Sequence, residues 1–266
     1  MTAQDRMIRT YDRTMVSRDY QQYFEDSGFY NFGYWNSHAK SQREASEALV
    51  DHLIDKIPNK EGRILDVACG PGGTTKRLLR SYAQDMITGI NVSQAQIAEA
   101  RKRAPGCTFH VMDATRLDFP EAQFDAVICV EAAFHFNTRD TFLRESLRVL
   151  KPGGSLVLSD MLLCKFFRPF AELAKIPRAN LVASIAEFRS HLAAAGFEAI
   201  DVRDATQACL GGFRRHVARW PASERRGGRM GIGKSLVASL VGWAMATYLG
   251  IVCRTYLLAS ARKPVI

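Results

Sequence analysis

The sequence lacks the cysteine spacings that are typical of small secreted domains with disulfides or of zinc-binding domains. Its six cysteines lie far apart, most of them in apolar runs, and no two form a C-x-x-C pair. This spacing favours reduced, buried thiols over a disulfide framework or a zinc site. The sequence also contains no H-x-x-x-H motif and no group of acids at metal-ligand spacing, so we expect no metal ion.

A signal peptide and a nucleic-acid-binding pattern are missing as well. The opening residues MTAQDRMIRTYDRT are polar, so we expect a cytoplasmic protein. The net charge is +9, but seven Lys or Arg against one Glu fall within residues 211–234, which concentrates the excess charge in one segment. Basic and aromatic residues do not interleave as they do on nucleic-acid-binding strands. We therefore expect no nucleic-acid partner.

What the sequence does contain is an alternation of short apolar runs with helical patterns. The runs typical of strands lie at 63–68, 86–90, 107–112, 124–130 and 155–161. Continuous apolar strands that alternate with helices are typical of a parallel sheet with both faces covered. The core therefore belongs to the α/β class.

The regions around this core read as caps and additional core elements. The predicted organisation is an N-terminal helical cap or lid at 1–60, a ligand-binding core at 61–161, a cap insert at 162–183, a core helix and strand at 184–206, a second cap insert at 207–253 and a final core strand at 254–266. Within the second insert, residues 207–234 read as irregular and residues 235–253 as an uncharged helix.

The uncharged helix has small residues at every fourth position. Ala238, Gly242, Ala246 and Gly250 form one face, which predicts close packing against another helix. We favour a cap over the substrate pocket or a homodimer contact. Nineteen uncharged residues also approach the length of a membrane span, so peripheral contact with an anionic membrane is an open alternative.

The stretch ILDVACGPGGTTKRLL at 64–79 places glycines where a strand passes into a helix. Ligands of open α/β sheets bind beyond the carboxyl ends of the strands, and glycines lacking Cβ let a ligand reach the backbone. A dinucleotide fingerprint would place its third glycine where Thr75 stands. Asp66 would in addition repel a pyrophosphate. The stretch therefore favours a ligand with positive charge and hydroxyl groups.

Five segments in register resemble a known family. ILDVACGPGG, TGINVSQAQI, VMDATRLDF, FDAVICVEAAFHF and LRESLRVLKPGGSLVLSD span residues 62–160 and are similar to the motifs of class I S-adenosylmethionine (SAM)-dependent methyltransferases. FYNFGYW at 29–35 resembles the N-terminal segment of the natural-product, sterol, tocopherol and cyclopropane-synthase branch. The resemblance implies a doubly wound, seven-stranded, mostly parallel, Rossmann-like sheet with a helical cap.

The resemblance also implies SAM as the cofactor and assigns parts of it to residues. Asp66 and Gly70 would flank the methionine part, and Tyr34 would close over it from the cap. Asn91 stands where the family usually has an acid for the ribose, so Gln96 is expected to supply hydrogen bonds there. The full implied set is Tyr34, Asp66, Ala68, Gly70, Asn91, Val92, Gln96, Asp113 and Ala114 for the adenine, and Glu131 at the mouth.

His135, in VEAAFHF, follows the fourth strand where relatives place a general base. A neutral imidazole can take a proton from a hydroxyl, an amine or an activated carbon. The alternative is a packed histidine between Phe134 and Phe136.

The expected activity is methyl transfer to O, N or C of an apolar or aromatic small molecule, in secondary metabolism. Two alternatives stay open. One is a lipid, prenyl or quinone methyltransferase at a membrane surface. The other is a non-methylating, pericyclase-like scaffold that binds SAM.

Overall fold

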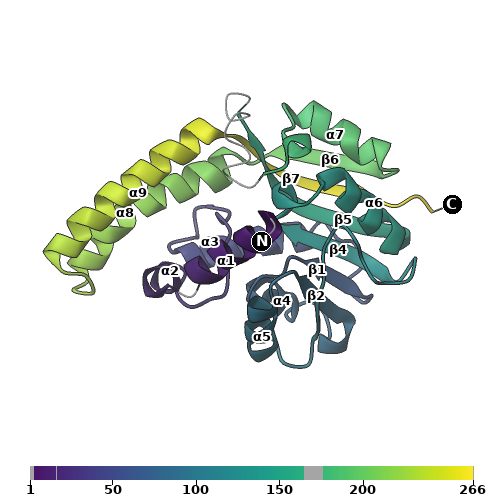
Figure 1. Ribbon diagram of the computed structural model, residues 1–266, viewed down its shortest axis with the longest axis horizontal. Coiled ribbons are helices and arrows are strands. Elements are labelled where there is room, and N and C mark those ends of the chain that lie inside the picture. The colour runs from purple at the N-terminus through teal and green to yellow at the C-terminus, as the bar shows by residue number, and fades with distance from the viewer. Residues whose placement is uncertain (1–2, 16, 165–175, 266) are drawn as a thin grey trace.

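The computed structural model describes residues 3–15, 17–164 and 176–265, and a seven-stranded sheet runs through them (Figure 1). The strand order is β3-β2-β1-β4-β5-β7-β6. The strands are β1 (Ile64–Val67), β2 (Ile87–Asn91), β3 (Thr108–Val111), β4 (Phe124–Val130), β5 (Leu150–Leu163), β6 (Glu198–Asp204) and β7 (Cys253–Arg262).

The sheet is doubly wound and mostly parallel, as expected. β1 to β5 pair in parallel, and β7 lies antiparallel between β5 and β6. From β1 the chain runs outward through β2 and β3 and then returns to place β4 on the other side of β1. The strand order therefore reverses between β1 and β4, where α/β folds bind their ligands.

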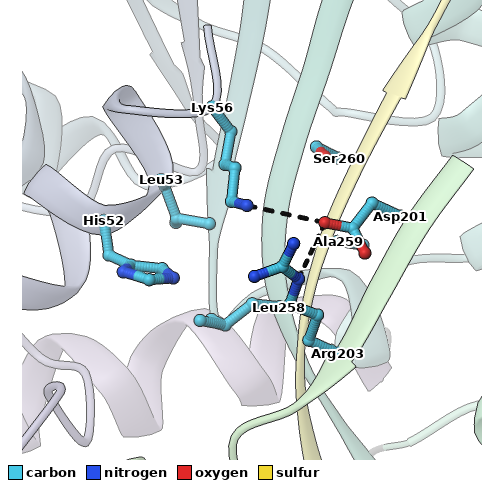
Figure 2. A pocket seen from close by; sticks show the side chains of 8 residues that line it. All are labelled: His52, Leu53, Lys56, Asp201, Arg203, Leu258, Ala259 and Ser260. Carbon is cyan, nitrogen blue, oxygen red and sulfur yellow. Dashed lines mark hydrogen bonds and ion pairs between the residues drawn. The ribbon is translucent and has the colours of Figure 1, made fainter. Parts of the chain in front are cut away.

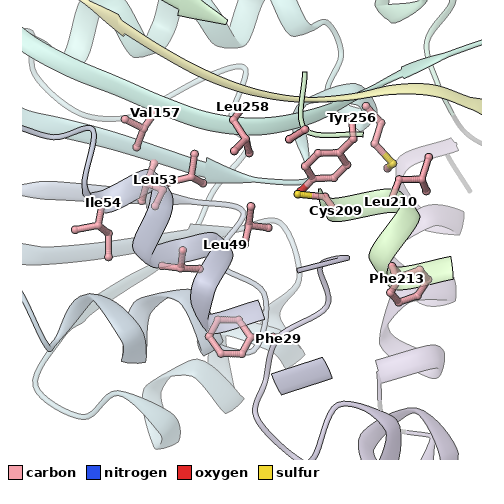
Figure 3. Packing of buried hydrophobic residues seen from close by; sticks show 14 of the residues in the cluster. Phe29, Leu49, Leu53, Ile54, Val157, Cys209, Leu210, Phe213, Tyr256 and Leu258 are labelled. Atoms are coloured by element: carbon pink, nitrogen blue, oxygen red, sulfur yellow. The ribbon is translucent and has the colours of Figure 1, made fainter. Parts of the chain in front are cut away.

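Both faces of the sheet are buried, which explains the continuous apolar runs. Successive residues of β1 face opposite sides, so Ile64 belongs to one core cluster and Leu65 to the other. Both side chains are fully buried. On the first face, Phe29 and Leu49 of the N-terminal region pack with Val157 and Leu258 of the sheet (Figure 3).

Side-chain caps begin several of the helices that cover the sheet. Ser93 caps α5 by accepting a hydrogen bond from the Gln96 backbone N–H, as the sequence predicts. Thr138 and Ser184 cap α6 and α7 in the same way. The helices are α1 (Ala3–Met15), α2 (Arg18–Tyr23), α3 (Gln42–Ile54), α4 (Gly73–Leu78), α5 (Gln94–Arg103), α6 (Arg139–Val149) and α7 (Ile185–Ala194), with short turns at η1 (Gln84–Met86), η2 (Ala133–His135) and η4 (Arg178–Asn180).

The expectation of an irregular segment at 207–234 is wrong. A π-turn, η5 (Gln207–Gly211), leads into α8 (Gly212–Arg226), and α9 (Ile232–Val252) then returns antiparallel along it. α8 is amphipathic: Phe213 and Val217 are buried at a spacing of four, while most of its arginines face outward. The density of arginines hid this period in the sequence.

The small-residue face of α9 packs on α8, which confirms the predicted helix contact. A Cβ on Gly242 would lie 2.6 Å from the carbonyl oxygen of Val217, and Ala246 is buried on the same side. Most of the large apolar side chains of α9 are exposed, so the helix is not buried as a core helix would be. Part of the first cap insert, 165–175, lies outside the described residues.

Candidate active site

The three glycines after β1 differ in what surrounds them. A Cβ on Gly72 would meet the Ala100 backbone at 2.8 Å, and one on Gly73 would meet the backbone of Gly28 at 2.6 Å. A Cβ on Gly70 would meet nothing closer than the Gln96 side-chain oxygen at 3.9 Å. Gly72 and Gly73 are therefore required by protein packing, whereas Gly70 borders open space.

The backbone of this turn takes up left-handed conformations. Ala68 and Gly70 have φ angles of +58° and +56°. Such angles are uncommon for a residue with a Cβ, so Ala68 is held there by the tight connection between β1 and α4. The turn aims its backbone groups beyond the carboxyl end of the sheet, where the resemblance places the methionine part of the cofactor.

Asp66 lies at the base of the turn and is fully buried. Its carboxylate accepts a 2.6 Å hydrogen bond from the Thr75 hydroxyl. Burial raises the pKa of Asp66 to about 7, and the Thr75 hydrogen bond opposes that shift. A carboxyl group in this state is suited to pairing with a cationic ligand, which would favour its ionised form.

The end of β2 carries an amide network where the family usually has an acid. The Asn91 amide donates to the Gln96 oxygen at 3.1 Å. On its other side, Gln96 donates to a carboxylate oxygen of Asp12 at 2.9 Å, and the Ser93 hydroxyl donates to the same oxygen at 2.8 Å. Val92 follows at the same strand end and is half-buried. A carboxylate is thus present at this end of the sheet, supplied by α1 instead of β2.

Asp113 and Ala114, which the resemblance assigns to the adenine, lie directly beyond β3. One oxygen of Asp113 accepts hydrogen bonds from the Thr115 backbone at 2.8 Å and from its hydroxyl at 2.7 Å. Ala114 is buried beside it. Asp113 is thereby fixed by a local turn at the carboxyl end of β3.

Glu131 joins three parts of the chain at the end of β4. One carboxylate oxygen accepts from the Phe32 backbone at 2.7 Å and from the Tyr256 hydroxyl at 2.5 Å. Burial of the carboxyl group raises the pKa of Glu131 to about 8, against the lowering effect of both hydrogen bonds. Glu131 therefore ties the N-terminal segment to β4 and β7 and carries a proton near neutral pH.

His135 faces α1. Its Nε2 lies 2.6 Å from the Tyr11 hydroxyl, and the two rings meet edge to face. Burial raises the pKa of Tyr11 to about 12, with a further contribution from the charge of Glu131. Tyr11 of α1 is therefore in direct contact with His135, and its hydroxyl feels the charge of Glu131.

A buried polar network holds the loop that carries His135. Asn180 donates to the carbonyl oxygens of Phe134 and Phe136 at 3.0 and 2.6 Å, on either side of the histidine. Its own oxygens accept from Arg139, whose guanidinium pairs with the fully buried Asp160 at 2.7 Å.

Tyr34 is placed differently from its expected role. Its ring stacks on His52 with centroids 4.9 Å apart, and it lines a cavity of about 530 Å³ beside Arg203 and Arg254. Next to this cavity, the pocket of Figure 2 measures only about 10 Å³. None of Tyr34's described ring or hydrogen-bond contacts reaches the glycine turn. In FYNFGYW, Phe32 bonds to Glu131, and the backbone of Phe29 lies against Gly73 of the glycine turn.

The cofactor implied by the resemblance fits the residues present. Open space borders Gly70. The carboxyl group of Asp66 suits the positive charges of a sulfonium and an ammonium group, while Asp12, Asn91 and Gln96 offer acceptors and donors suited to ribose hydroxyls. Among the residues that the structure describes, no group of three or more His, Cys, Asp or Glu could hold a metal ion.

Sequence reasoning missed the residues that reach the site from far along the chain. Tyr11 and Asp12 lie in a polar segment without a motif, and their partners are 124 and 84 positions away. Arg139, Asp160 and Asn180 were likewise not anticipated. An arginine in an otherwise buried position of α6 was the one signal available for this network.

Comparison with known proteins places these observations in context. Residues 64–154 match a family described as a methyltransferase domain. The chain is 35% identical over 188 residues to 27-O-demethylrifamycin SV methyltransferase of Amycolatopsis mediterranei (strain S699), covering 66% of this chain and 68% of that protein. It is 32% identical over 191 residues to O-methyltransferase cnsE of Penicillium expansum, covering 66% and 68%.

Solved structures of the same architecture extend the comparison. The [4+2]-cyclase SpnF superposes with a TM-score of 0.64 at 28% identity, covering 88% of this chain and 87% of that one. Geranyl diphosphate C-methyltransferase from Streptomyces coelicolor A3(2), solved with Mg²⁺, geranyl diphosphate and S-adenosyl-L-homocysteine, has a TM-score of 0.70 at 15% identity, covering 99% and 98%. The second likeness supports the fold alone.

Proposed function

Because the chain belongs to the class I SAM-dependent methyltransferases, we propose that it methylates a hydroxyl oxygen of an apolar or aromatic small molecule of secondary metabolism. The printed names of the two relatives above describe oxygen methylation. The observation that carries the choice of oxygen is the 2.6 Å contact between His135 Nε2 and the Tyr11 hydroxyl. A hydroxyl group already occupies the position from which this nitrogen can accept a proton.

In this proposal each residue of the site has a defined task. The bound cofactor supplies an electrophilic methyl group on sulfur. Asp66 and the Gly70 turn would hold its amino acid part, and Asp12 with Gln96 would hold the ribose. The acceptor hydroxyl would take the place of Tyr11 on His135. Nε2 would remove its proton as the hydroxyl oxygen bonds to the methyl carbon and the bond from that carbon to sulfur breaks, with the demethylated cofactor as leaving group.

The surroundings of His135 favour an apolar acceptor. Phe134 and Phe136 flank it in the sequence, and Phe32 stacks on Phe213 at 4.5 Å beside Glu131. Aromatic walls exclude water and orient a flat or apolar substrate. Peripheral membrane contact is part of the proposal, and the exposed apolar face of α9 supports it.

His135→Ala provides the test. Positioned proton transfer contributes about 10²–10⁴-fold, so we expect kcat for a hydroxyl acceptor to fall within that range while SAM affinity, measured by calorimetry, is unchanged. Tyr11→Phe is the matched control, because it removes the phenol and keeps the imidazole; we expect its kcat to stay within about tenfold of the parent. Equal turnover of His135→Ala and parent would refute a base role.

A product screen separates methyl transfer from scaffolding. The protein would be incubated with SAM and a panel of apolar phenols and alcohols, and the products weighed by mass spectrometry. A gain of one methyl group on oxygen supports the proposal. An acceptor rearranged without added mass would instead favour the pericyclase-like alternative.

A further inference from the structure

The α8–α9 hairpin extends away from the sheet, with α8 on the side of the N-terminal helices and α9 outermost (Figure 1). α9 has 21 residues, and only 17% of its most apolar 18-residue stretch is buried. A core helix of this composition would be mostly buried, so the exposed apolar surface of α9 requires another explanation. The exposed large apolar side chains are Ile232, Leu236, Val237, Leu240, Val241, Trp243, Met245, Tyr248 and Ile251.

The neighbouring helix is strongly basic. Arg215, Arg219 and Arg226 follow a spacing of four and seven, so they share one face of α8, and all three are exposed. From Gly211 to Lys234 the chain carries seven Lys or Arg against one acid, Glu224. That acid pairs with Arg229 at 2.7 Å, so its charge is offset within the hairpin.

We propose that the α8–α9 hairpin docks the protein onto an anionic lipid surface, with α9 lying in the plane of the interface. Apolar side chains on α9 would enter the region between headgroups and acyl chains, and the arginines of α8 would contact lipid phosphates. Trp243 and Tyr248 are of the side-chain types that favour this depth.

The topology excludes a membrane span for α9. β7 begins at Cys253, directly after the helix, and pairs with β5 from Ser155 to Leu163. Both ends of the hairpin therefore return to one side, and α8 is too highly charged to accompany α9 through a bilayer. When the hairpin lies in the plane of the interface, the apolar side chains of α9 are buried and the arginines of α8 reach the headgroups.

Charge and shape favour lipid over a second copy of the chain. Apolar residues cover a broad arc of α9. A helix from a second copy would bury only one side of that arc. A second copy would also bring two like-charged arginine faces close to each other, whereas anionic headgroups complement them.

The hairpin also connects the lipid surface to the candidate site. Phe213, in the first turn of α8, stacks on Phe32, whose backbone donates to Glu131. A docked hairpin would therefore hold the wall of the site next to the bilayer, where apolar acceptors concentrate. The docking proposal itself is independent of the proposed reaction, because lipid binding is measured without turnover.

The first test measures partitioning of the full-length protein onto vesicles by flotation. We expect binding to phosphatidylcholine vesicles containing phosphatidylglycerol, weakened by salt, and much weaker binding to phosphatidylcholine alone. Replacing Arg215, Arg219 and Arg226 together by Gln should lower the partition coefficient about a hundredfold. The control with equal charge loss replaces the exposed Arg80, Lys102 and Arg144 by Gln and should change it about threefold or less.

The second test addresses insertion of α9. Leu240→Asp, at a residue 70% exposed, should abolish binding, whereas Val265→Asp, at a residue 74% exposed near the C-terminus, should not. Brominated lipids should quench part of the tryptophan fluorescence, and Trp243→Phe should remove that quenching. Circular dichroism of each variant checks folding.

Two results would overturn the proposal. One is equal binding to neutral and anionic vesicles, or no binding to either. The other is a salt-resistant dimer in sedimentation that Leu240→Asp converts to a monomer without any vesicle binding.

Discussion

Gly70 and Gly72 show how two glycines of one turn serve different purposes. Both have positive φ angles, +56° and +90°, so both favour glycine by conformation alone. They differ in their surroundings: Gly72 abuts the backbone of Ala100, and Gly70 borders open space. The packing around Gly72 therefore requires glycine for the fold, and we propose that the ligand requires glycine at position 70.

This difference predicts opposite phenotypes for two matched substitutions. Gly70→Val should leave a folded protein whose melting temperature falls slightly, since left-handed backbone costs about 1–2 kcal/mol for a residue with a Cβ, while SAM binding is lost. Gly72→Val should destabilise the fold strongly because its side chain meets backbone at 2.8 Å. Differential scanning fluorimetry and calorimetry separate the two. Undiminished SAM affinity in Gly70→Val would contradict the site.

Asp12 is the residue that brings a carboxylate to the end of β2. It accepts from Ser93 and Gln96, and hydrogen bonds to charged groups contribute about 1.5–3 kcal/mol each when well formed. Since Asp12 is partly exposed, we expect Asp12→Ala to weaken SAM binding roughly tenfold in calorimetry. Asp85→Ala, at an exposed acid outside the site, is the control. Equal affinity in parent and Asp12→Ala would show that α1 does not serve the cofactor.

At the scale of elements, the loop before α6 shows how buried polar groups position the side chain that we propose as the base. Arg139 is 1% exposed and Asp160 0%, so each charge depends on the other. Buried pairs of this kind contribute little net stability, but they hold their neighbours in one arrangement. Here the neighbour is Asn180, which fixes both sides of the His135 loop.

The contact between α8 and α9 makes a second element-scale prediction. Gly→Ala inside a helix normally stabilises by about 0.5–1 kcal/mol. At Gly233, where a Cβ would meet nothing within 4 Å, we expect that gain. At Gly242 the new methyl group would lie 2.6 Å from the Val217 carbonyl oxygen, so we expect a loss of about 1–3 kcal/mol. Urea unfolding of the two variants measures the difference in sign. Equal stabilisation by both would contradict the close packing.

At the scale of the whole molecule, two buried carboxyl groups link stability to pH. The pKa of Glu131 is raised to about 8 and that of Asp66 to about 7, chiefly by burial. The folded state therefore holds protons that the unfolded state releases above about pH 4–5. The contribution of these two groups to stability without cofactor should therefore fall as pH rises from about 5 to 8.

Glu131→Gln tests this linkage. Each such group contributes a slope of at most about 1.4 kcal/mol per pH unit, and glutamine does not titrate. We expect the melting temperature of Glu131→Gln to fall less between pH 5 and 8 than that of the parent. Glu99→Gln, at an exposed acid, should follow the parent curve. Parallel curves for all three proteins would show that Glu131 ionises normally.

Sequence determined the sheet and most of its cofactor edge. Each strand is a short apolar run that buries both faces, and the turn after β1 is recognisable from its glycines. The backbones that require Gly72 and Gly73, those of Ala100 and Gly28, come from distant parts of the chain. Asp66, Gly70, Asn91 and Asp113 could be placed because each lies at the carboxyl end of a strand or within about three residues after it, and the carboxyl ends of parallel strands meet at one edge. Such information is local, and the order of strands follows from the family resemblance.

The tertiary structure alone decided what covers that edge and what remains uncovered. Contacts between Tyr11 and His135, Asp12 and Gln96, and Glu131 and Tyr256 span 84 to 125 positions, so no local pattern encodes them. The same holds for α9: its composition allows a core helix, a cap or a membrane contact, and only its neighbours distinguish them. Because α8 covers a single face of it, the structure leaves the remaining apolar surface exposed.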